Sequence, residues 1–135
     1  MFDTVIIGGG AAGLSAALVL GRCVRRVLVF DDGRYRNTSS KSLHCFMGSD
    51  GVAPSALLKR ARSQLARYDT VSTMRERVSK VEMGPAHFLV EREGHHPVMG
   101  QTVLVATGVV DELPKIPGLA PLFGTSVHVC PYCDG

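Results

Sequence analysis

Residues 4–22 read TVIIGGGAAGLSAALVLGR, an apolar run that is interrupted by three consecutive glycines. Because glycines break a continuous helix, the run predicts a short buried strand at 4–7, a tight turn, and a helix from about 12 to 22. The stretch RRVLVFDD predicts a second buried strand at 26–31. Continuous apolar strands without alternation are typical of a parallel sheet that is covered on both faces. The beginning of the chain therefore predicts a β-α-β unit.

The same apolar run is not expected to enter a membrane or to direct secretion. No basic residue precedes it, Asp3 lies where a signal peptide carries positive charge, and the glycines interrupt any helix. The chain of 135 residues is long enough for one compact domain. Its net charge of +3 and its lack of tryptophan give no sign of a nucleic-acid surface. We therefore expect a cytoplasmic protein that binds neither membranes nor nucleic acid.

Gly8, Gly10 and Gly13 have the spacing of the dinucleotide-binding fingerprint, between a predicted strand and a predicted helix. The first glycine permits a tight turn, the second lets the backbone approach a diphosphate, and the third lets the helix pack on the strand. Asp31 follows Gly13 by 18 residues and ends the second strand, where its carboxylate can bond ribose hydroxyls and disfavours a 2′-phosphate. The pattern predicts a dinucleotide site for FAD or NAD, with NADP the poorest fit.

A further helix is expected to begin at Pro54, since proline is tolerated in a first turn. Apolar side chains then recur at helical spacing and predict one buried face, which consists of Leu58, Ala61, Leu65 and Tyr68. The basic residues of the same segment are interpreted as a solvated face; they are Lys59, Arg60, Arg62 and Arg67.

Residues 70–106 change in character. TVSTM, RVSKVEM, HFLVERE and QTVLVATG are short strand-like stretches separated by turn residues at 84–85 and 94–97. A parallel β-α-β core is therefore expected to be followed by a three-stranded antiparallel meander. The proline- and glycine-rich stretch 112–124 is interpreted as a connector that leaves this domain.

The chain ends on HVCPYCDG, which contains the Cys-x-x-Cys pair Cys130 and Cys133. Zinc is one interpretation, although His128 and the two thiols supply at most three nearby ligands. Two inert buried thiols are another. Redox-active dithiol chemistry is favoured, because the pair occurs in a chain with a dinucleotide site. A helix beginning at Cys130 would stabilise its thiolate, and Asp134 can hold or deliver a proton.

The chain resembles the thioredoxin reductase family of FAD-dependent pyridine nucleotide-disulfide oxidoreductases in five stretches that occur in order. They are DTVIIGGGAAGLSAALVLGR, VLVFDDGRYRN, HCFMGSDG, VATGVVDELPKIPG and CPYCDG. The resemblance implies an α/β, Rossmann-like, FAD-binding three-layer fold with a parallel sheet and an antiparallel β-meander, incomplete in this chain. It divides the chain into the first segment of the FAD domain, 1–118, and a crossover into a pyridine-nucleotide domain, 119–135.

The resemblance also implies residue roles. The implied FAD contacts are Gly8, Gly10, Ala12, Gly13, Asp31, Gly33, Arg36, Asn37, Cys45, Gly48, Thr107 and Gly108. Cys133 would face the flavin, Cys130 would attack the substrate disulfide, and Asp134 would be the general acid. No metal is expected. Electrons would pass from NADPH through FAD to the cysteine pair and on to a thioredoxin-like protein or a small-molecule disulfide or dithiol. The resemblance allows a homodimer.

Some features depart from the family pattern. Ala11 replaces a proline of the glycine turn, and Cys45, interpreted as a small buried thiol, stands where many members have asparagine or glycine. No second glycine fingerprint and no closing Gly-Asp motif follow, so we expect the chain to be the first part of a longer enzyme, lacking the NADPH domain. Two alternatives stay open: an FAD-dependent dithiol oxidase that uses oxygen, and a non-catalytic flavin-binding remnant.

Overall fold

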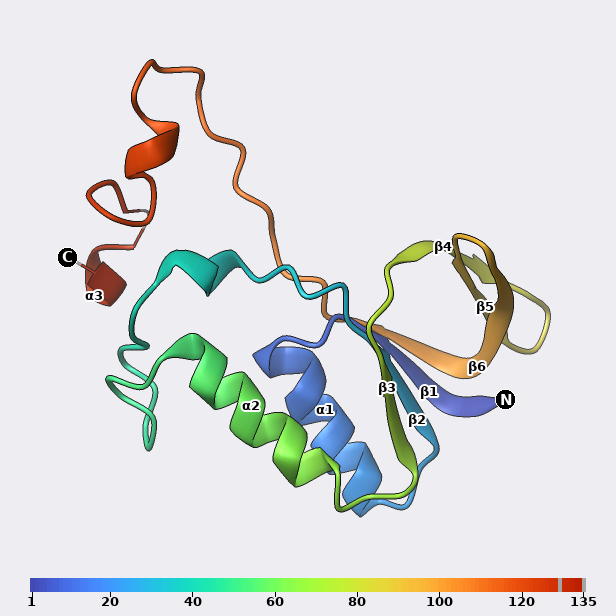
Figure 1. Cartoon of the computed structure of the whole chain (residues 1–135). Coiled ribbons are helices and arrows are strands. Elements are labelled where there is room, and N and C mark those ends of the chain that lie inside the picture. Colours follow the sequence, from blue (N-terminus) through green and yellow to red (C-terminus); the bar gives the residue numbers. More distant parts are fainter. Residues whose placement is uncertain (129, 135) are drawn as a thin grey trace. The chain divides into compact units, whose positions relative to one another are not determined.

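The computed structural model describes residues 1–128 and 130–134, without the side chains of Cys133 and Asp134. The strands of the described residues are β1 (Phe2–Ile7), β2 (Val27–Phe30), β3 (Val71–Met74), β4 (Val78–Met83), β5 (Phe88–Arg92) and β6 (His95–Val105). The α-helices are α1 (Ala11–Arg22), α2 (Pro54–Leu65) and α3 (Pro131–Asp134), and short 3-10 turns occupy Arg36–Ser39 and Ala120–Leu122 (Figure 1).

The chain divides into two compact units. The sheet unit comprises Met1–Arg34 and Ala61–Gly108, and the loop unit comprises Tyr35–Arg60 and Val109–Gly135. All six strands belong to the sheet unit, whereas the loop unit contains the 3-10 turns and α3.

The strands of the sheet unit form one mixed sheet in the order β3-β2-β1-β6-β5-β4. β1 pairs in parallel with both β2 and β6, and β2 pairs in parallel with β3. β5 pairs antiparallel with β4 and with the first half of β6. The predicted β-α-β core and the predicted three-stranded antiparallel meander are therefore both confirmed, and β6 belongs to both.

The start of β6 differs from the sequence-based expectation. A turn was predicted at 94–97, but β6 already begins at His95 and runs through Pro97. Between Val90 and Arg92 the pairing moves two residues along β5 and three along β6, so the strand carries an extra residue there. A bulge of this kind accommodates a proline, which cannot donate to the ladder. The predicted turn thus lies only around Gly94, whose φ is 74°.

The core of the sheet unit has three layers. Val5 of β1 and Phe30 of β2 pack with Val90 of β5 in one fully buried cluster, so the meander covers one face of the parallel strands. Ile6, the neighbour of Val5, points to the opposite face and meets Gly13 of α1. Figure 1 shows α1 and the β4–β5 hairpin on opposite sides of β1 and β2. These layers confirm the predicted Rossmann-like α/β fold.

α2 begins at Pro54, as predicted. Leu58 and Leu65 of its predicted apolar face are 7% and 4% exposed, which confirms that they are buried. Lys59, Arg60 and Arg67 are exposed. Within the described residues, the longest helices are too short and carry too little apolar sequence to cross a membrane.

Replacing Val90 by alanine should lower the free energy of unfolding by about 2 kcal/mol, because the side chain is completely buried between the meander and the parallel strands. The matched control is Val81→Ala, since Val81 pairs with Val90 across the ladder but is 38% exposed. Urea unfolding should show a clearly smaller loss for the control. Equal losses in the two variants would contradict the three-layer core.

Candidate functional site

The three fingerprint glycines in the turn between β1 and α1 have different surroundings and therefore different roles. Gly8 has φ of 112°, and a side chain there would collide with the Ala106 carbonyl at the end of β6. A side chain on Gly13 would collide with the Gly8 carbonyl oxygen. Within the described part of the chain, no atom lies within 4 Å of the position that a Gly10 side chain would occupy. The fold itself therefore requires the first and third glycines, whereas the second faces open space that a ligand can enter.

The N-terminus of α1 lies directly at Gly10. This residue is the N-cap, no side chain caps the helix, and no acidic residue lies in its first turn. The first N–H groups of a helix have no intrahelical partner and carry the positive end of its dipole. Ala11 and Ala12 begin the helix and are exposed. The turn and the helix end thus fit the diphosphate of a dinucleotide.

The segment after β6 closes on the same turn. The Ala106 N–H donates to the Ile7 carbonyl at 2.8 Å, and Thr107 continues past Gly8. Gly108 follows with φ of 68°. The structure therefore places Thr107 next to the glycine turn and Gly108 directly after it in the chain, although the contact of both residues with FAD stays a prediction.

Asp31 follows β2 and lies against the glycine turn. A side chain on Gly9 would collide with its carboxylate. Its Oδ1 accepts a hydrogen bond from the Gly33 N–H at 2.9 Å, and its Oδ2 accepts one from Nη2 of Arg62 at 2.9 Å. The Asp31 side chain is only 13% exposed. The structure thus places Asp31, which is predicted to bind the ribose, against the glycine turn, which is predicted to bind the diphosphate.

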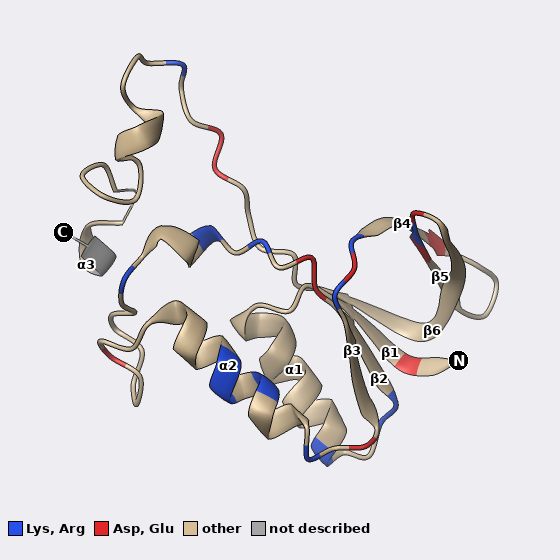
Figure 2. Ribbon diagram, in the orientation of Figure 1, with Lys and Arg blue, Asp and Glu red and all other residues tan. Residues whose placement is uncertain are grey.

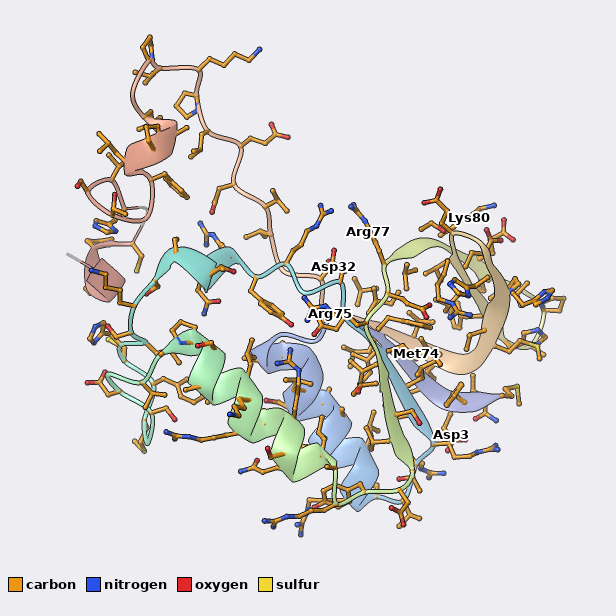
Figure 3. The ribbon with its side chains drawn as sticks, viewed as in Figure 1. Asp3, Asp32, Met74, Arg75, Arg77 and Lys80 are labelled. Atoms are coloured by element: carbon orange, nitrogen blue, oxygen red, sulfur yellow. The ribbon has the colours of Figure 1, made fainter. Side chains whose placement is uncertain are left out.

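Arg62 has a role that the sequence-based interpretation did not include. It was placed on a solvated face of α2, and its side chain is 41% exposed, but its guanidinium forms an ion pair with Asp31. Arg75, at the end of β3, lies against Gly33. Figure 2 shows acidic and basic residues in the segments that follow β2 and β3, and Figure 3 labels Asp32 and Arg75 there. No local sequence signal could have linked Arg62 with a partner 31 residues away.

In the loop unit, Arg36 forms a bidentate ion pair with Asp111. Its Nε and Nη2 donate to the two carboxylate oxygens, both at 2.8 Å. The hydrogen bond from Arg36 lowers the pKa of Asp111 below its ordinary value of 3.8, against a smaller opposing effect of desolvation. Arg36 was predicted to contact FAD, whereas Asp111 was missed, because its partner lies 75 residues away in the sequence.

Cys45 is exposed, so its interpretation as a small buried thiol is wrong. It has φ of 60°, an unusual conformation for a residue with a side chain. Its N–H donates to Oδ1 of Asp50 at 2.9 Å, which holds this turn. The neighbouring His44 bonds the Ser42 hydroxyl at 2.8 Å. Gly48 lies in the same loop with φ of 79°.

A pocket of about 210 Å³ in the loop unit brings several predicted residues together. Arg36 and Asn37, predicted cofactor contacts, line it together with Cys130, the predicted nucleophile. His128 and Asp111 line it as well, whereas Cys45 and Gly48 do not.

Cys130 is half-buried and immediately precedes the four-residue helix α3. The side chains of Cys133 and Asp134 lie outside the described part of the chain, so their predicted roles stay predictions. Cys23 and Cys45 are both unpaired thiols. In the part of the chain that the structure describes, no three His, Cys, Asp or Glu side chains gather as a metal site would require.

The different roles of Gly10 and Gly13 can be tested by replacing each residue with alanine, which adds one methyl group. Gly13→Ala should lower the free energy of unfolding by about 1–3 kcal/mol, because the methyl group collides with backbone. Gly10→Ala should cost less than about 1 kcal/mol, because the methyl group enters open space and φ is already −77°. Thermal unfolding of both variants measures the difference. If Gly10→Ala were as unstable as Gly13→Ala, the space next to Gly10 would not be open to a ligand, and this interpretation of the turn would be contradicted.

The chain is similar to known proteins along its whole length. The sequence profile of the pyridine nucleotide-disulphide oxidoreductases matches residues 2–135. Thioredoxin reductase tcpT of Claviceps purpurea is 40% identical in an alignment 136 positions long, which covers 98% of this chain and 42% of that protein. Thioredoxin reductase sirT of Leptosphaeria maculans is 36% identical in an alignment 138 positions long, which covers 100% of this chain and 42% of that protein.

Among solved structures, an oxidoreductase from Agrobacterium tumefaciens superposes with a TM-score of 0.94 at 42% identity, over 98% of this chain and 45% of that one. The chain spans 35% to 44% of the length of four curated relatives that are named thioredoxin reductases or a probable thioredoxin reductase. The three-layer fold, the glycine turn and the profile match over residues 2–135 agree, and the chain belongs to the pyridine nucleotide-disulphide oxidoreductase family, with thioredoxin reductases among its relatives.

Proposed function

We propose that this chain supplies the FAD-binding and disulfide-bearing part of a thioredoxin reductase-type oxidoreductase. The observation that carries the proposal is the open, uncapped N-terminus of α1 at Gly10 with the Asp31 carboxylate against the same turn. A helix end of this kind favours a diphosphate, and a carboxylate at the end of the second strand favours a ribose with two hydroxyls. The description of the family and the names of the relatives favour disulfide chemistry over other dinucleotide reactions.

The residues present fit FAD. Backbone N–H groups from Gly10 to Ala12 would hold the diphosphate, and Asp31 would hold the adenosine ribose. Thr107 and Gly108 would complete this site. FAD, when bound, supplies the two-electron exchange that connects an NADPH donor with the cysteine pair.

The cysteine pair would carry the exchange with the partner. The Cys130 thiolate attacks one sulfur of a partner disulfide, that S–S bond breaks, and a mixed disulfide forms. The departing thiolate takes a proton from Asp134. Cys133, as a thiolate, then attacks the Cys130 sulfur, which releases the second partner thiolate and leaves a Cys130–Cys133 disulfide. The partner gains two electrons, and the pair loses two.

The partner of this exchange is proposed from the relatives' names. Several of them are named thioredoxin reductases, which favours a thioredoxin-like protein with an accessible disulfide. A small-molecule disulfide or dithiol uses the same sulfur chemistry at Cys130. The half-burial of Cys130 at the loop-unit pocket requires that the partner sulfur reach into a recessed site.

Changing Asp31 to alanine should weaken FAD binding by about 1–3 kcal/mol, because charge-assisted hydrogen bonds to the ribose are lost. Titration of the chain into FAD, followed by the change in flavin fluorescence, measures the affinity. Asp69→Ala is the control, since Asp69 is an exposed carboxylate of the same unit. An Asp31→Ala variant that binds FAD like the original chain would show that the acid is wrongly assigned.

Oxidation of the chain should produce a Cys130–Cys133 disulfide and leave the exposed Cys23 and Cys45 open to alkylation. The two-residue spacing can bring the sulfurs of the first pair within bonding reach, whereas Cys23 and Cys45 have no comparable sequence constraint. Mass spectrometry of peptides after thiol alkylation, with and without prior reduction, distinguishes the pairs. A Cys23–Cys45 bridge, or zinc released in stoichiometric amount by thiol modification, would contradict the redox assignment.

A further inference from the structure

The Asp31 carboxylate is held at both of its oxygens. The backbone N–H of Gly33 bonds Oδ1, and the guanidinium of Arg62 bonds Oδ2, each at 2.9 Å. The first bond comes from the turn that follows Asp31 itself, whereas the second comes from α2, far along the chain. Leu65, three residues after Arg62, is 4% exposed, so the end of α2 that carries Arg62 is anchored by packing.

Two bonds at two oxygens restrict the carboxylate more than one bond does. A hydrogen bond from Gly33 alone fixes one oxygen and leaves the plane of the carboxylate able to rotate about the side-chain bonds. The planar, always charged guanidinium of Arg62 fixes the second oxygen. The result is a carboxylate whose orientation against Gly9 is set before any ligand binds.

The ion pair between Arg62 and Asp31 also reduces the repulsion between the Asp31 carboxylate and an anionic ligand. A dinucleotide diphosphate is an anion, and the proposed diphosphate turn lies next to the Asp31 carboxylate. An unpaired carboxylate at that place would repel the ligand. Arg62 offsets the repulsion while leaving the oxygens in place as acceptors for hydroxyl groups.

We propose that Arg62 is a positioning residue that sets the affinity and the 2′-hydroxyl selectivity of the adenosine end of the site. The proposal rests on the dinucleotide function proposed above. Arg62 holds Asp31 toward the ribose, and Asp31 in turn keeps the Arg62 guanidinium engaged so that it does not attract a 2′-phosphate. In the absence of the Asp31 carboxylate, the Arg62 guanidinium should be able to donate to a 2′-phosphate, with Arg75 close by at Gly33.

The alternative is an ion pair that only fastens α2 to the sheet. Such a pair would change stability when it is broken, but it would not change how the chain distinguishes two nucleotides that differ at the 2′ position. Selectivity is therefore the readout that separates the two roles.

The test is calorimetric titration of the full 135-residue chain with 5′-ADP and with 2′,5′-ADP. The original chain should favour 5′-ADP. R62Q should weaken 5′-ADP binding about tenfold, and R62K should recover part of the loss, because it keeps the charge but not the planar fork. R67Q is the matched control, since Arg67 is exposed next to the end of α2, and it should behave like the original chain.

A second pair of variants tests the selectivity directly. D31S should bind 2′,5′-ADP about tenfold more tightly than the original chain does, and D31S/R62Q should lose that gain. In both of these variants the Asp31 charge is already gone, so neither leaves that carboxylate buried without Arg62. They decide the proposal even if R62Q alone does not fold.

The outcomes are distinguishable. If the original chain binds 5′-ADP and R62Q binds it equally well, or if D31S and D31S/R62Q bind 2′,5′-ADP alike, the role of Arg62 is overturned and the dinucleotide site stands. If the folded original chain binds neither nucleotide, the proposed function is overturned and the role of Arg62 with it.

Discussion

The close approach of backbone at the glycine turn is the constraint on which the rest of the site depends. Gly8 lies against the end of β6, and Gly13 lies against Gly8, so β1, β6 and α1 meet with no side chain between them. β1 is flanked in parallel by β2 and β6, and its register sets Ile7 opposite both Phe30 and Val105. The three strand ends therefore lie at one edge, and α1 starts there with its N–H groups directed outward. A side chain at either glycine would move that helix end.

The parallel pairing of β1 with β2 then places Asp31 beside the glycine turn. Because β2 runs in register beside β1, the residue after Phe30 emerges next to the turn that follows Ile7. Asp31 is that residue, and its N–H donates a hydrogen bond to the carbonyl oxygen of Met74 in β3. The sheet thus fixes the backbone of Asp31, while Gly33 and Arg62 fix its carboxylate. In open α/β sheets ligands bind outside the carboxyl ends of the strands, which is where Asp31 lies.

The sequence was sufficient for features that depend on short-range patterns. Apolar runs, glycine spacing and turn residues predicted the β-α-β core, the start of α2 at Pro54 and the meander, because each pattern reports on burial or backbone conformation nearby. Long-range pairings were not accessible in this way. Arg62 looked like any other basic residue of an amphipathic helix, and Asp111 lies 75 residues from Arg36. The bulge at Pro97 and the exposure of Cys45 likewise depend on which strand or loop is adjacent in space.

A crystal structure of the chain grown with ADP tests the central claim most directly, since it locates the diphosphate without relying on activity. We expect density for the diphosphate at the N-terminus of α1, within hydrogen-bond reach of the backbone between Gly10 and Ala12, and density for the ribose with its hydroxyls bonded to Asp31. ADP bound at another place, with the glycine turn empty and Asp31 still bonded only to protein groups, would contradict it.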